Sequence, residues 1–133
     1  MSAIQTGLDV LEPLCLARHA EMGAERRGAT RRADVRTYFL VHSAVDALKA
    51  MRAGRAEAAR ALLRRWRVLA EAMLHRQLFG DDPCTLAVPL GEPAAAVYGV
   101  DGATACLVTM VRGQAALLRA AMREAGVEVD VAV

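Results

Sequence analysis

A single glycine, Gly54, separates two long segments in which apolar residues recur at the spacing of an α-helix. Before it, the apolar positions are Tyr38, Val41, Val45 and Leu48. After it, they are Leu62, Trp66, Leu69 and Met73. The pattern predicts two antiparallel helices at about 30–53 and 55–79, packed as a hairpin, with the run 38–41 deeply buried because it is apolar all round. One continuous helix across Gly54 is the alternative.

The turn itself resembles a known helical repeat. The segment from Gly54 to Ala59, Gly-Arg-Ala-Glu-Ala-Ala, resembles the turn between the two helices of tetratricopeptide-type hairpins. Asp46 and Trp66 depart from that family's pattern, and no repeat of about 34 residues follows. The resemblance therefore implies a tight antiparallel hairpin and no repeat architecture.

Two further segments have helical character, since the chain is 55% hydrophobic and much of that share is alanine, the strongest helix former. Gly7 and Pro13 disfavour a helix interior, so we expect a helix at about 13–25 preceded by a short helical turn. Another is expected from 101 or 102 to 125, ended by Gly126. The prolines and glycine between 80 and 100 predict an irregular connection. The predicted fold is mainly α, a four-helix bundle-like single domain over 1–133.

The tail alternates between valine and other residues from Val127 to Val133. This period of two predicts a short C-terminal strand with one buried face. Its pairing partner would be residues 85–90 of the same chain or the same tail of a second subunit, and a frayed tail is the remaining alternative.

Composition bears on the compartment. The three cysteines, Cys15, Cys84 and Cys106, are odd in number and far apart, which favours reduced thiols over a disulfide framework. No basic segment followed by an apolar one begins the sequence, and the longest apolar run, 102–111, is about half the ~20 residues of a membrane-spanning helix. We therefore expect a cytoplasmic protein that does not enter membranes.

Charge is unevenly distributed along the chain. Residues 26–67 carry a net +9, whereas 1–25 carry −3 and 68–133 carry −4. Such a chain can present a basic face to an anion or pair with itself. The candidate anion-binding residues are Arg31, Arg32, Arg60, Arg64 and Arg67. Recognition of DNA by a helix-turn-helix would need an apolar residue about six positions after the turn, where Arg60 stands.

Antiparallel pairing about Gly54 groups several polar side chains. It brings His42 level with Trp66, and His75 level with Asp34, Tyr38 and Glu71. A carboxylate that orients a histidine is a general-base arrangement, although such helix faces are more often simply solvated. A pair formed by His42 and Asp46, one helical turn apart, would satisfy the imidazole. The pocket candidates are Tyr38, His42, Trp66, Glu71 and His75.

Motifs of known chemistry are absent from the sequence. It contains no Cys-x-x-Cys pair, no glycine-rich phosphate loop and no Gly-x-Ser-x-Gly elbow, so we expect no catalytic residue, metal or cofactor. The predicted function is non-enzymatic: an interaction or assembly protein, a helical homo-oligomer, most simply a dimer, that binds a protein partner. The alternatives are a nucleic-acid or other anion binder through 26–67, and a small-molecule-binding bundle or enzyme with a pocket near Tyr38, His42 and Trp66.

Overall fold

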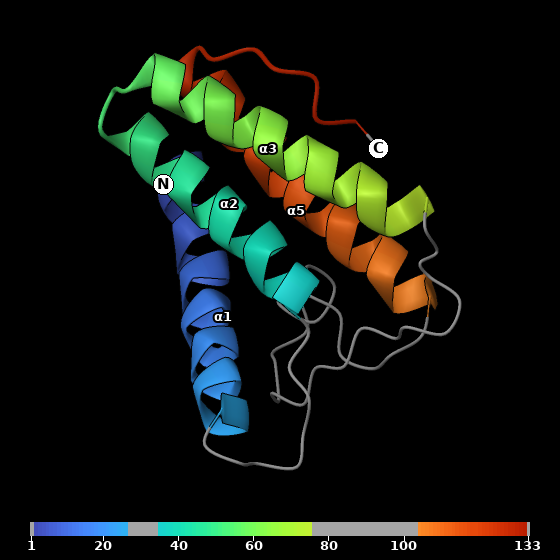
Figure 1. Ribbon diagram of the computed structural model, residues 1–133. Helices are drawn as coiled ribbons and strands as arrows, with labels where there is room; N and C mark the ends of the chain where they lie inside the picture. The colour runs from blue at the N-terminus through green and yellow to red at the C-terminus, as the bar shows by residue number, and fades with distance from the viewer. Residues whose placement is uncertain (1, 27–34, 76–103, 133) are drawn as a thin grey trace.

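The computed structural model describes residues 2–26, 35–75 and 104–132, which form helices followed by an extended tail (Figure 1). The helices are α1 (Ala3–Arg26), α2 (Val35–Arg52), α3 (Ala56–His75) and α5 (Thr104–Ala125). The described part of the chain is mainly helical, as predicted. Its helices include none that is long and apolar enough to cross a membrane. The expected connection over 80–100 lies outside the described residues.

The predicted hairpin at Gly54 is confirmed. Gly54 has a φ of +74°, a left-handed conformation that glycine adopts without strain. Its N–H donates to the carbonyl of Met51 at 3.1 Å, and the N–H of Arg55 donates to Ala50 at 2.9 Å. This is a Schellman motif, which ends α2 and starts α3 in the opposite direction. The same motif ends α5, where Gly126 has a φ of +70° and Val127 donates to Met122 at 3.1 Å.

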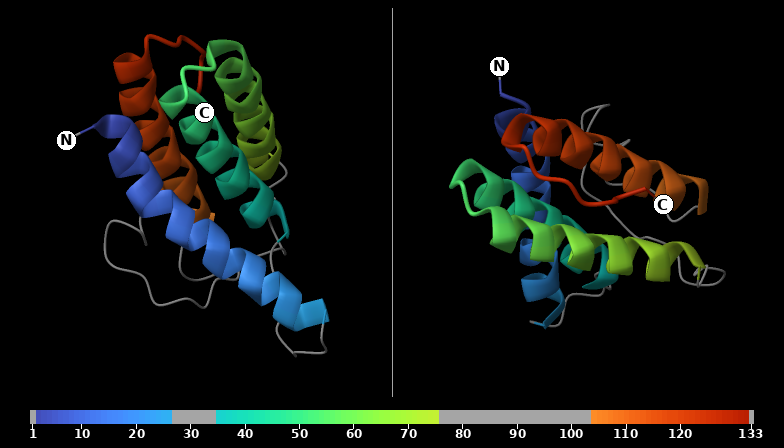
Figure 2. Two further views of the ribbon diagram at one scale, coloured as in Figure 1. Left: turned by 90° about the vertical axis from the view of Figure 1, so that its left-hand side faces the viewer. Right: turned by 90° about the horizontal axis from the view of Figure 1, so that it is seen from above.

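Helix α2 is the centre of the bundle. It packs against α1, α3 and α5, whereas α3 and α5 touch each other little (Figure 2). Its buried side chains cover most of its circumference, as at Leu40, Val41, Ala44, Val45, Ala47 and Leu48, whereas Phe39, His42, Asp46 and Lys49 lie along the stripe that faces solvent. The expectation of deep burial for the whole run 38–41 is wrong in part, because Tyr38 is half-buried and Phe39 is 40% exposed. Within this run, full burial therefore begins at Leu40.

Helix α1 differs from its prediction. It is one uninterrupted helix with Pro13 inside it, where we expected a break before residue 13. Pro13 and Asp9 are both exposed, so the carbonyl of Asp9 that proline leaves unpaired lies on the solvent side. Gly7 is buried against α2, and a Cβ there would lie 3.0 Å from Cδ1 of Leu48. Gly7 therefore permits a close helix crossing instead of ending a helix.

The start of α1 and the end of α5 are joined by one carboxylate. Glu124, in the last turn of α5, accepts hydrogen bonds from the hydroxyl of Ser2 and from the N–H groups of Ala3 and Ile4, at 2.7, 2.9 and 3.1 Å. It thus caps the N-terminus of α1, where the first N–H groups have no partner within the helix. These hydrogen bonds lower the pKa of Glu124 below its usual 4.5.

The predicted C-terminal strand is not found among the described residues. The segment 127–132 runs back beside α3 and α5 without forming a strand (Figures 1 and 2). Its alternation is nevertheless expressed in burial: Val127 and Val131 are buried, and Glu128 and Asp130 are exposed. The valines pack against helix side chains, which bury apolar surface without supplying a β-ladder. Residues 85–90, one of the proposed pairing partners, lie outside the described part.

Gly7→Val tests the crossing of α1 and α2. We expect the free energy of unfolding to fall by about 1–3 kcal/mol, because the added atoms must displace Leu48 or separate the helices. Denaturant unfolding followed by circular dichroism measures the loss. Ala58→Val, at an exposed position of α3, introduces the same side chain and should cost less than about 1 kcal/mol. Equal losses in the two variants would contradict the close crossing.

Candidate functional site

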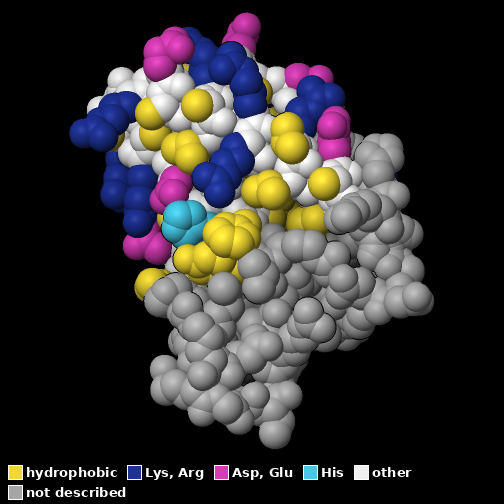
Figure 3. All heavy atoms as spheres, in the orientation of Figure 1, with side chains coloured by type: hydrophobic (Ala, Val, Ile, Leu, Met, Phe, Trp, Pro, Cys, Tyr) yellow, Lys and Arg dark blue, Asp and Glu magenta, His cyan; other side chains and the backbone are white. Residues whose placement is uncertain are grey.

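The basic residues predicted to bind anions are partly neutralised within α3. Arg60 forms an ion pair with Glu57, and Arg67 pairs with Glu71 at 3.0 Å and with Asp130 at 2.7 Å. Arg64 is exposed and has no ion-pair partner among the described residues. Basic and apolar side chains are mixed over the face of α2 and α3 seen in Figure 3. Arg31 and Arg32 lie outside the described part of the chain.

Trp66, a pocket candidate, is a core residue. Its side chain is fully buried, and its indole N–H donates to Oε1 of Gln114 on α5 at 2.9 Å. Gln114 is itself fully buried. This hydrogen bond joins α3 to α5 through the interior, since the two helices otherwise touch little. A buried indole N–H requires an acceptor, so the pair has a structural explanation.

Tyr38 and His42 lie on the other side of α2, towards α1. Their ring centroids are 5.4 Å apart, and Nδ1 of His42 lies 3.2 Å from Oδ2 of Asp46, which confirms the predicted pair. Burial and the nearby carboxylate of Asp46 raise the pKa of the Cys15 thiol. Burial, with Cys15 and Asp46 nearby, also raises the pKa of the Tyr38 hydroxyl. Cys15 is thus a protonated thiol at neutral pH, which does not suit nucleophilic catalysis.

The predicted layer of Asp34, Tyr38, Glu71 and His75 is described only in part. Asp34 lies outside the described residues, and the side chain of His75 is among those not described. Glu71 contacts Arg67, one turn before it on α3. Tyr38 contacts Phe39 and His42, with ring centroids at 5.4 Å in both pairs.

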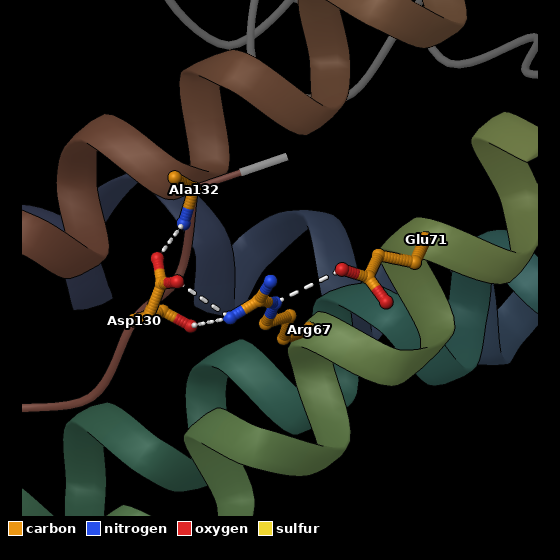
Figure 4. Close-up of polar contacts among 4 residues, drawn as sticks. All are labelled: Arg67, Glu71, Asp130 and Ala132. Carbon is orange, nitrogen blue, oxygen red and sulfur yellow. Dashed lines mark hydrogen bonds and ion pairs between the residues drawn. The ribbon is translucent and has the colours of Figure 1, made fainter.

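The C-terminal tail is fastened to α3 through Arg67. One nitrogen of its guanidinium donates to Oδ2 of Asp130 at 2.7 Å and to the carbonyl of Asp130 at 3.3 Å, while Nε donates to Glu71 (Figure 4). Oδ1 of Asp130 accepts the N–H of Ala132 at 3.0 Å. The hydrogen bond from Ala132 and the charge of Arg67 lower the pKa of Asp130 below its usual 3.8. Asp130 therefore holds the tail as a charged carboxylate.

Two open grooves run along this fastened tail. The larger one, of about 810 Å³, lies between the tail and α5 and is lined by Arg119, Met122, Arg123 and residues 126–130. The smaller one, of about 480 Å³, lies between the tail and α3 and is lined by Arg64, Arg67, Val68, Glu71 and residues 128–130. Both volumes fall in the range of roughly 300–1,000 Å³ found for ligand sites.

The main chain of the tail is available on both sides. Besides the contacts of Val127, Asp130 and Ala132 given above, its N–H and C=O groups between 128 and 131 form no hydrogen bond within the described part of the chain. Unpaired groups in an extended segment are the feature that allows another strand to be added. The tail and its two grooves are therefore the candidate site.

The amino-acid sequence indicates the buried face of the tail but not the grooves beside it. The alternation of valines was a correct signal for a segment with one buried face. Nothing in the local pattern indicated that α3 and α5 would be the flanking walls, because this depends on how the helices pack. Among the candidate residues, Arg64, Arg67 and Glu71 line the smaller groove, whereas Tyr38, His42 and Trp66 line neither.

A double-mutant cycle tests the hydrogen bond between Trp66 and Gln114. Gln114→Met keeps the volume but removes the acceptor, so we expect a loss of about 1–3 kcal/mol in the free energy of unfolding. Trp66→Phe also destabilises, by loss of packing and of the donor. The double variant should lose less than the sum of the two, since the indole N–H that Gln114→Met leaves without its acceptor is then absent. Strict additivity would show that the two side chains are not coupled.

The pH dependence of stability tests the role of Asp130. Because its pKa is lower in the folded protein than its usual 3.8, the carboxylate stabilises the fold above that value, and this effect disappears as the pH falls through the folded pKa. We expect Asp130→Asn to have a lower Tm than the wild type at pH 7 and a similar Tm at about pH 2. Glu128→Gln, at an exposed tail position, should match the wild type at both values. A constant difference for Asp130→Asn would contradict the assignment.

Neither a metal-binding cluster among the described residues nor a similar known protein identifies the function of this site. The described residues contain no group of three or more histidine, cysteine or carboxylate side chains placed to hold a metal ion. Neither a family model, nor a curated protein, nor a solved structure matches the chain.

Proposed function

We propose that this protein is a non-enzymatic interaction module that holds an extended segment of a partner protein beside its C-terminal tail. One observation carries the proposal: the tail has unpaired main-chain groups between two open grooves. Main-chain hydrogen bonds provide affinity for an extended peptide, and the neighbouring side-chain pockets provide specificity.

The tail is held in place before any partner arrives. Val127 and Val131 are buried at its two ends, and Arg67 holds Asp130 between them. A segment that is already ordered loses little conformational entropy on binding, which favours affinity. The partner segment would bear most of the cost of ordering.

The other two hypotheses have less support. Arg60 and Arg67 have carboxylate partners, which weakens an anion-binding face on α3. Trp66 is enclosed in the core, so a small-molecule pocket would have to be built on Tyr38 and His42 without it. Self-association remains compatible with the proposal, because the extended segment can belong to a second copy of the chain.

A proline in the tail tests the proposal. Val129→Pro removes one main-chain N–H, whereas Val129→Ala retains it and shortens only the side chain. Peptides selected from a phage-displayed library of random linear sequences on the wild-type protein should bind it and Val129→Ala similarly. Fluorescence polarisation should show binding to Val129→Pro at least about tenfold weaker, a difference of about 1.4 kcal/mol. Thermal unfolding checks that both variants remain folded.

Two results would contradict this proposal: no enrichment of peptides on the wild-type protein, or equal binding to the Val129→Pro variant. Light scattering over a range of concentrations provides a further comparison. A dimer in the wild type that becomes a monomer in Val129→Pro would identify a second copy of the chain as the partner and support the docking role.

A further inference from the structure

We infer that the groove between the tail and α5 takes an acidic, extended segment of a different protein, added as a strand to the tail at Val129 and held by Arg119 and Arg123. This inference rests on the proposed docking function. It specifies which groove the partner occupies, which side of the tail it pairs with and the chemistry of the partner. It follows from the hydrogen-bonding direction of the tail, the free charges of the groove, and a match of spacing.

The hydrogen-bonding direction of the tail selects the groove. In an extended chain, the N–H and C=O of one residue point to the same side, and those of the next residue point to the opposite side. The carbonyl of Asp130 faces α3, because it accepts a hydrogen bond from Arg67. The main-chain groups of Val129 then face α5, where the larger groove lies. A strand added there would pair with Val129 without displacing Arg67.

The free charges of this groove are mainly positive. Arg119 and Arg123 are exposed on α5, and neither has an ion-pair partner within the described residues. Of the nearby carboxylates, Asp130 is engaged by Arg67 and Glu124 caps α1, which leaves Glu128 alone. Met122 and Val127 are buried beneath the groove and give it an apolar floor. An occupant with acidic and apolar side chains in alternation complements both features.

The spacing of the two arginines matches that of a strand. Arg119 and Arg123 are four residues apart on α5, which corresponds to about 6 Å along a helix at about 1.5 Å per residue. Side chains on one face of a strand recur every second residue, about 6.6 Å apart. Two carboxylates separated by one apolar residue can therefore each meet one arginine, while the apolar side chain between them faces Met122 and Val127.

The segment is assigned to a different protein, although the tail itself contains the pattern acid–valine–acid at 128–130. In a second copy, Val127 and Val131 are buried in its own core and Asp130 is bound to Arg67. Moving that tail into a neighbouring groove would break these contacts. A free acidic segment has no such contacts to lose.

Labelled synthetic peptides test the inference on the full chain. The probes are a peptide in which valine alternates with glutamate, one in which valine alternates with lysine, and one with the composition of the first but its glutamates consecutive. Fluorescence polarisation should show that only the first binds the wild type, with an affinity that falls as salt is added. Binding should weaken at least about tenfold in the double variant Arg119→Glu, Arg123→Glu. The lysine peptide should bind that variant instead.

The matched control is Arg112→Glu, an exposed arginine on α5 that does not line the groove. It should leave binding of the glutamate peptide unchanged. Equal weakening in Arg112→Glu, or equal binding of the lysine and glutamate peptides to the wild type, would overturn the acidic assignment. If the peptides bound the wild type but not Val129→Pro in that case, the docking function would stand and the acidic assignment alone would be wrong. A dimer that the glutamate peptide dissociates would overturn the assignment to a different protein.

Discussion

At Gly54 the chain turns back on itself, and the arrangement of the described helices depends on that turn. The left-handed conformation of Gly54 and the two hydrogen bonds of its Schellman motif end α2 and place α3 beside it. Because α1 and α5 also pack on α2, this helix has buried side chains around most of its circumference. A continuous helix through residue 54 would leave the buried face of α3, including Leu63 and Trp66, without a partner.

Helices α3 and α5 touch each other little, and it is between them that the tail lies. The hydrogen bond between Trp66 and Gln114 joins these helices in the interior, and the buried valines of the tail pack on the outer side. Arg67 and Glu124 complete the arrangement, since one fastens the tail to α3 and the other joins α5 to the start of α1. The same tail that closes the bundle presents its free main chain to solvent, which links its structural role to the proposed docking role.

The sequence predicted local features of this site better than its location. The i,i+4 pair of His42 and Asp46 was predictable because it depends only on helical spacing. Burial of the tail valines followed from their alternation, but the strand did not form, because a β-ladder needs a partner that the helices do not supply. The role of Gly7 was not predicted, because a glycine at a helix crossing cannot be distinguished in the sequence from a glycine that ends a helix. The partners of Arg67 come from residues 4 and 63 positions away, and spacing could suggest only the nearer one.

The sequence by itself determined the helical character of the chain, the reversal at Gly54, the end of α5 at Gly126 and the alternating burial of the tail. These depend on side-chain periodicity and on the backbone freedom of glycine, which act over a few residues. Only the tertiary structure decided that α1 continues through Pro13, that Trp66 meets Gln114, and that the tail lies between two grooves with Arg119 and Arg123 exposed beside it. Such features depend on which helix faces meet, and that is settled by packing between residues far apart in the chain.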